Sequence, residues 1–158
     1  MAEEDISDLL RFLDPFPSDK QQIALQLREW VWKMYPTANE LIYDNYNALA
    51  FGWSPTDRQG HIFCSVALYR GGSKMHFGFY WGNEIDDPER ILIGEGNRYR
   101  YYPVADLESF PKTYMEGLVK EAYANSFAKI KDQKQIVEGK TIVKMVLDKK
   151  RQAKISKK

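Results

Sequence analysis

The apolar and polar residues between Ser18 and Tyr35 alternate with the period of an α-helix. Ser18 and Gln21, three positions apart, have the pattern of a capping box, which closes the first turn of a helix. Five apolar residues follow at helical spacing: Ile23, Leu27, Trp30, Val31 and Met34. Pro36 disfavours helical geometry in the residue before it. The pattern therefore predicts a helix over 18–35, and a shorter amphipathic element is predicted over 6–13.

From Leu41 to Pro103 the pattern changes to β-branched and aromatic residues between glycine-bearing turns, which indicates strands. Gly71 and Gly72 suit a two-residue turn, so the hairpin 61–81 should pair residues whose numbers sum to 143. This register predicts a core face made of Cys64, Val66, Leu68, Met75, Phe77 and Phe79. It predicts a partly open face made of Ser65, Ala67, Tyr69, Lys74, His76 and Tyr80. A further strand is expected around 99–104.

A last helix is predicted over 111–127, where Pro111 suits the first turn. The order helix, antiparallel sheet, helix defines an α+β fold, most simply a two-layer sandwich with both helices on one face of the sheet. We expect one domain over residues 1–130, because the length fits a single core and no internal repeat is present.

Charge divides the chain unequally. Residues 129–158 contain 11 Lys and Arg against 3 Asp and Glu, a net charge of +8, whereas the first 128 residues carry −7. Residues 131–158 are therefore predicted to be a basic, solvated C-terminal tail that is dispensable for folding. Within it only TIVKMVL, residues 141–147, is apolar enough for a short helix or strand.

Four segments in this order also carry a family resemblance: PTANELIYDNYNALAFGW, FCSVALY, KMHFGFYWG and GNRYRYYPVADLE. They resemble the bacterial YdhG-like family of domains of unknown function, over roughly residues 18–130. The resemblance implies a frataxin-like fold. It also implies iron as a cofactor or cargo to consider, because some members are proposed intracellular iron chaperones, although most have no assigned activity.

A polar and aromatic cluster interrupts the apolar pattern before residue 48 and is the first candidate site. It consists of Tyr43, Asp44, Asn45, Tyr46 and Asn47. If this segment begins a strand beside the hairpin, Asp44 and Asn47 would approach His76, and Asp44 would orient the imidazole and raise its pKa. The alternatives are turn geometry for the Asp and Asn residues and an ordinary surface histidine.

Metal binding has weaker signals. His61, Cys64 and His76 are not expected to converge, because Cys64 and His76 fall on opposite faces of the hairpin. Asp5 and Asp8 belong to an acidic N-terminal cluster that could bind a hard cation such as iron. The predicted helix 18–35 carries few acids, so any Fe(II) binding is expected to be weak, and a solvated acidic surface is the alternative.

Nucleic acid is a further candidate partner. Arg98 and Arg100 alternate with Tyr99, Tyr101 and Tyr102, and single-strand binders combine such aromatic and basic side chains. The net charge of −7 on the body opposes this interpretation, which would then depend on the basic tail. Both arginines are kept as candidate ligand-binding residues.

The expected cellular compartment and the expected class of protein follow from features that the sequence does not have. Cys64 is the single cysteine, and no apolar run approaches the roughly 18 residues of a membrane span, so a cytoplasmic location without membrane contact is expected. The sequence has no complete nucleophile, metal or phosphate-binding signature. It predicts a small cytosolic binding or accessory protein more readily than an enzyme.

Overall fold

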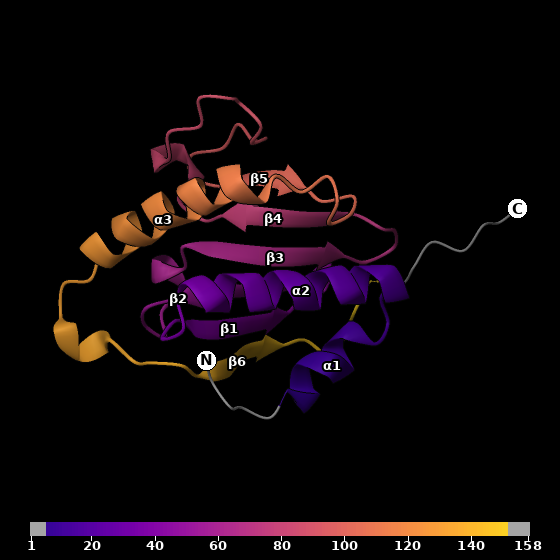
Figure 1. Cartoon of the computed structure of the whole chain (residues 1–158). Helices are drawn as coiled ribbons and strands as arrows, with labels where there is room; N and C mark the ends of the chain where they lie inside the picture. Colours follow the sequence, from indigo (N-terminus) through magenta and orange to yellow (C-terminus); the bar gives the residue numbers. More distant parts are fainter. Residues whose placement is uncertain (1–5, 152–158) are drawn as a thin grey trace, which may run out of the picture.

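The computed structural model describes residues 6–151. It contains three α-helices, namely α1 (Ser7–Leu13), α2 (Ser18–Met34) and α3 (Lys112–Ala128). Its six strands are β1 (Asn39–Asp44), β2 (Ala48–Ser54), β3 (Cys64–Tyr69), β4 (Met75–Phe79), β5 (Arg100–Pro103) and β6 (Thr141–Val146). They form one sheet in the order β5-β4-β3-β2-β1-β6 (Figure 1). No helix among the described residues is long and apolar enough to cross a membrane.

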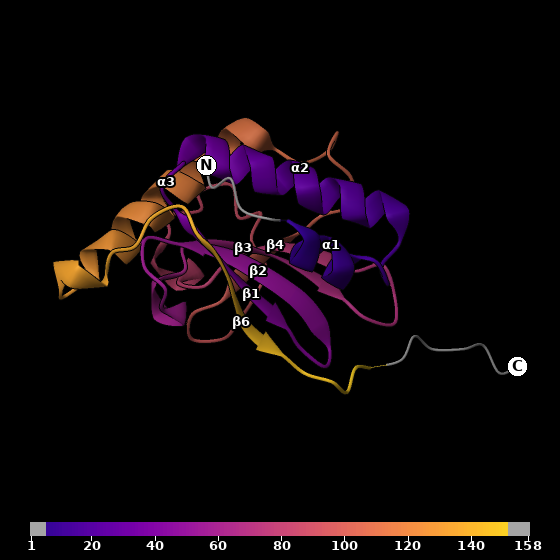
Figure 2. The same cartoon turned by 90° about the horizontal axis from the view of Figure 1, so that it is seen from below.

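All three helices lie on the same side of the sheet, and the opposite face has no helix over it (Figures 1 and 2). The predicted α+β class is confirmed. The sheet is mixed, however, because β6 runs parallel to β1 while the other neighbouring strands are antiparallel. The prediction of a wholly antiparallel sheet is therefore wrong at this one edge.

The hairpin between β3 and β4 has the predicted register. Val66 pairs with Phe77 and Ala67 with His76, so the residue numbers sum to 143. Gly71, in the turn, has a φ of 84°, a left-handed conformation that glycine adopts without steric cost. Because side chains alternate along a strand, Val66 and Phe77 face the buried core and His76 faces the helix-free side.

The core lies between this sheet and α2 with α3. The apolar side of α2 is buried, including Leu27 and Val31, as its helical spacing predicted. Trp30 packs edge-on against Phe77 of β4 and Phe110, with ring centroids 5.7 and 5.4 Å apart. The capping box does not form: the N-cap residue is Pro17 rather than Ser18, and the Gln21 side chain donates a hydrogen bond to the Phe16 carbonyl at 2.9 Å.

The segment predicted as a dispensable tail contributes a strand to the sheet. Glu40 of β1 pairs with Thr141 of β6, and the Glu40 N–H donates to the Lys140 carbonyl at 2.7 Å. The Asn39 side chain, fully buried, donates to the Val137 carbonyl at 2.6 Å. The sheet therefore continues to Val146, well past the boundary placed at residue 130.

Candidate functional site

The helix-free face of the sheet has a floor of small side chains. Leu49, Phe51 and Trp53 of β2 point into the core, and the residues between them are small. Together with β3 these residues supply the floor of a hollow of about 400 Å³: Ala48, Ala50, Gly52, Ser65 and Ala67. Larger side chains at these positions would fill it. We call it the tyrosine hollow, after the residues that surround it.

Tyrosine rings make up much of its wall. The hollow is lined by Tyr43 of β1, Tyr69 of β3, Tyr80 and Tyr99. Tyr99 lies directly over Gly78 of β4, where a Cβ atom would come within 2.6 Å of the ring. Glycine is thus needed at this position for the ring to approach the strand. Burial raises the pKa of Tyr99, so its phenol stays protonated near neutral pH.

Tyr43 contributes an unused hydrogen-bonding group. Its hydroxyl is buried and has no hydrogen-bond partner within residues 6–151. Burial, and then the nearby Tyr80, raise the pKa of the Tyr43 phenol, so the group keeps its proton. A buried hydroxyl without a partner is costly and uncommon in folded proteins. Tyr43 lines the tyrosine hollow, so a rotation of its side chain would bring the hydroxyl to a ligand there.

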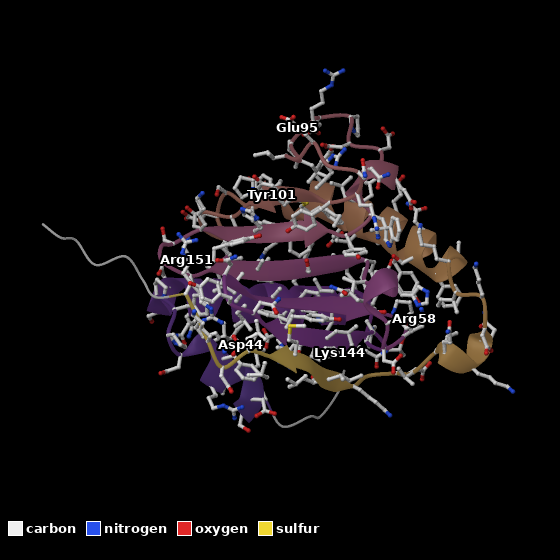
Figure 3. All side chains as sticks on the ribbon, turned by 180° about the vertical axis from the view of Figure 1, so that it is seen from behind. Asp44, Arg58, Glu95, Tyr101, Lys144 and Arg151 are labelled. Atoms are coloured by element: carbon white, nitrogen blue, oxygen red, sulfur yellow. The ribbon has the colours of Figure 1, made fainter. Side chains whose placement is uncertain are left out.

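His76 stands beside the hollow in a row of neighbouring aromatic rings. It lies 4.7 Å from Tyr69 and is stacked on Tyr101 at 3.8 Å, centroid to centroid. Tyr101 continues to Tyr99 at 5.8 Å, and Figure 3 shows this face with Tyr101 labelled. Burial first, and then the charge of Lys74, lower the pKa of His76. The imidazole is therefore mostly neutral at pH 7.

The predicted pairing of Asp44 with His76 is wrong. Asp44 sits opposite Leu49, a core residue, and so points to the helix-bearing side of the sheet. There it forms an ion pair with Arg70 and a second with Lys150, at 3.2 Å. Its carboxylate therefore anchors the end of the β3–β4 hairpin. The pKa of His76 is lowered, whereas the predicted pairing would have raised it.

The other residues of the predicted cluster divide between two places. Asn45 lines the tyrosine hollow, and its backbone carbonyl accepts a hydrogen bond from Arg70 at 3.0 Å. Asn47 lines a second hollow beside Tyr69. Tyr46 is exposed and lines neither. Only Tyr43 and Asn45 of the five therefore meet in the tyrosine hollow.

The two candidate arginines have different environments. Arg98 lines the tyrosine hollow, where its guanidinium lies 4.7 Å from the ring centroid of Trp81. No carboxylate within residues 6–151 forms an ion pair with it. Arg100 lies opposite Phe79, a core residue, in the register of β4 with β5, and its side chain donates to the Gly96 carbonyl at 2.8 Å. Arg98 can therefore meet a ligand in the hollow, whereas Arg100 does not line it.

The candidate metal residues lie apart. Asp5 is outside the described residues, and Asp8 is exposed and bonded to Arg11 at 2.8 Å. Cys64 is fully buried in the core, while His61 contacts the Thr56 hydroxyl at 2.7 Å. Within residues 6–151 no three His, Cys, Asp or Glu side chains gather as a metal site requires. Iron binding stays a prediction from the resemblance.

The floor of the hollow is the part that residue-by-residue reasoning missed. Candidate sites were sought among polar and charged side chains, whereas Ala50, Gly52 and Ala67 are marked by small size. The signal was present, because ALAFGW alternates small residues with large apolar ones. Such alternation on a strand predicts one packed face and one hollow face.

Comparisons of the chain with protein-family models, with curated proteins and with solved structures give no significant match. The YdhG-like resemblance therefore stays a prediction, and the geometry of the open sheet face is the basis for assigning a function.

Proposed function

We propose that this chain is a binding protein whose ligand occupies the tyrosine hollow on the helix-free face of the sheet. The observation that carries the proposal is the hollow of about 400 Å³, with its floor of small side chains and wall of tyrosines, beside which the Tyr43 hydroxyl is buried without a partner within residues 6–151. Small-molecule sites are typically concave, largely apolar and supplied with a few polar groups. This hollow has that composition.

The lining selects a class of ligand. The floor is flat because it is made of small residues, namely Ala50, Gly52 and Ala67, and tyrosine rings surround it. A flat ring system fits such a floor and can stack against the tyrosines. Arg98 is the one charged residue that lines the hollow among those described, so a neutral or anionic ligand is favoured over a cation. The proposed ligand is a planar organic molecule, neutral or negatively charged, with an acceptor for the Tyr43 hydroxyl.

A fluorescent planar anion, 8-anilinonaphthalene-1-sulfonate, provides the test. Titration into the full chain should give saturable binding at one site. Ala50→Phe places a ring into the hollow and should abolish that binding. Ala124→Phe, at an exposed position on α3, is the matched control and should bind the dye as the parent chain does. Unchanged dye binding in a cooperatively folded Ala50→Phe variant would show that the hollow is not the site.

The frataxin-like relation is proposed at the level of fold. The order helix, sheet, helix and the shared side of α2 and α3 support it. A cytoplasmic location is proposed because Cys64, the single cysteine, is buried and unpaired, as is usual in reducing compartments.

Iron carrying is kept as the alternative function. Exposed carboxylates such as Asp8 are expected to bind Fe(II) weakly, since Asp8 is paired with Arg11 and no three such ligands gather within residues 6–151. Anaerobic calorimetry measures this directly. Tight binding at one site, lost in Asp5→Asn with Asp8→Asn, would favour the iron chaperone over the small-molecule binder.

A further inference from the structure

A second hollow adjoins the tyrosine hollow, and a third adjoins the second. A basic hollow of about 420 Å³ is lined by Asn47, Tyr69, Arg70, Lys74 and Arg151 with the two turn glycines, and it shares Tyr69 with the tyrosine hollow. A third, of about 630 Å³, lies toward β5 and shares Lys74 with the basic hollow. The shared residues make the three hollows neighbours, and we call them together the open-face track, of which the third hollow also reaches Lys20 of α2.

The charge of this track differs from that of the whole body. Arg98, Lys74 and Arg151 line it, none of them forms an ion pair within residues 6–151, and no carboxylate among these residues lines it. Arg70 and Lys20 also border the track, but Arg70 is paired with the Asp44 carboxylate and the Lys20 ammonium donates to the Ala105 carbonyl at 3.0 Å. The body's negative charge therefore lies elsewhere, and part of it is neutralised inside the fold. The track is thus a local region of positive potential on a chain whose first 128 residues are net negative.

Aromatic rings follow the same track. Tyr69, His76, Tyr101 and Tyr99 form a row in which successive ring centroids are 4.7, 3.8 and 5.8 Å apart. The row crosses β3, β4 and β5, so it runs across the strands. Stacking platforms for nucleic acid bases have this composition, with aromatic rings for the bases and cations for the phosphates.

We propose that the open-face track binds single-stranded nucleic acid. Bases would stack on the exposed parts of the aromatic row, and phosphates would lie against Lys74, Arg98 and Arg151. The inference rests on the proposed function in one respect, since the tyrosine hollow receives one of the planar bases. From β1 to β5 the sheet spans four strand spacings, about 19 Å, which gives room for more than one nucleotide.

A single strand fits this surface better than a duplex. In a duplex the base faces are stacked on one another, whereas single-stranded bases can be splayed out onto aromatic side chains. A hollow of about 400 Å³ with a small-residue floor can accept a splayed base. The inference also differs from binding by the basic tail alone, because Lys74 and Arg98 of the track lie outside residues 131–158.

Fluorescence anisotropy with the full chain tests the proposal. The probes are labelled oligouridylate and oligothymidylate of about ten nucleotides, within the usual size of single-strand sites. Lys74→Glu should weaken binding about tenfold and reduce the salt slope by about 0.7, the loss of one phosphate contact. Lys120→Glu makes the same charge change at an exposed position on α3 and should leave binding unchanged.

A second variant examines the aromatic row. Tyr101→Ala should weaken binding at least fivefold while the salt slope stays the same, since stacking does not depend on counterions. Thermal melting verifies that the variant folds. If it does not, Tyr101→Leu keeps the apolar bulk without the ring and should show the same loss.

Four outcomes would overturn the inference. The first is that no oligonucleotide binds at about 50 mM salt. The second is that a duplex binds as tightly as the single strand, and the third is that polyphosphate competes as well as an unlabelled oligonucleotide. The fourth is that binding is lost when Lys154, Lys157 and Lys158 are replaced by Gln but is kept in Lys74→Glu. Saturable dye binding without oligonucleotide binding would reject this inference and leave the proposed function standing. Failure of both would reject both.

Discussion

Removal of residues 131–158 should destabilise the fold, because it deletes β6 from the edge of the sheet. β6 lies beside β1, whose Asn39 and Glu40 are fully buried and hydrogen-bonded to this segment. Composition alone predicts a solvated tail whose removal costs no stability, whereas the structure predicts a loss, so the truncated chain distinguishes the two expectations. The variant to measure is a chain that ends at Ile130.

Four hydrogen bonds set the expected magnitude. Asn39 donates to the Val137 carbonyl at 2.6 Å and accepts from the Lys140 N–H at 3.0 Å. Glu40 donates through its N–H to the Lys140 carbonyl at 2.7 Å and accepts from the Thr141 hydroxyl at 3.1 Å. Water replaces these partners when β6 is absent, so each bond contributes a net 0.5 to 1.5 kcal/mol, roughly 2 to 6 kcal/mol in all.

Urea unfolding, followed by circular dichroism, measures the free energy of unfolding for each chain. A chain ending at Arg151 retains β6 and serves as the control, with a stability expected within about 0.5 kcal/mol of the full chain. The chain ending at Ile130 should lose at least about 2 kcal/mol, or fail to fold cooperatively. A loss below about 1 kcal/mol would mean that β6 contributes no more than an exposed tail.

Three further predictions concern single positions. The NMR titration of His76 should have its midpoint below the usual pKa of 6.5, and this midpoint should not move in Asp44→Asn. Because the pKa is lowered in the folded state, the stability that neutral His76 contributes is present above pH 6.5 and is lost on acidification. A lowered midpoint in the variant would contradict the placement of Asp44 and His76 on opposite faces. Gly78→Ala should displace the Tyr99 ring and weaken dye binding, detected by fluorescence titration. Arg28→Met should cost about 3 to 5 kcal/mol in urea unfolding, because it leaves a buried carboxylate unpaired.

Local patterning predicted those elements whose partners are close in sequence. Helical spacing located α2, and turn chemistry at Gly71 set the register of β3 with β4. The pairing of Glu40 with Thr141 joins residues that are distant in sequence, and no local pattern specifies it. Strand preference depends strongly on context, so TIVKMVL, between charged residues, was compatible with a helix, a strand or a solvated segment.

The candidate site was predicted in part, and the division follows the alternation of side chains along a strand. The β1–β2 hairpin pairs residues whose numbers sum to 93, which sets Tyr43 against Ala50 and Asp44 against Leu49. Leu49 belongs to the core, so Tyr43 alone of the two could face the open side with His76. Grouping both with His76 overlooked this alternation.

The same alternation explains why the open face is suited to binding. A strand that places Leu49, Phe51 and Trp53 in the core must place its intervening residues on the other side, and here those residues are small. A sheet face that only met water would gain from larger polar side chains, which shield the strands. Small residues ringed by tyrosines instead leave a concave surface beside the buried, unpartnered Tyr43 hydroxyl, and from this geometry we propose a planar ligand.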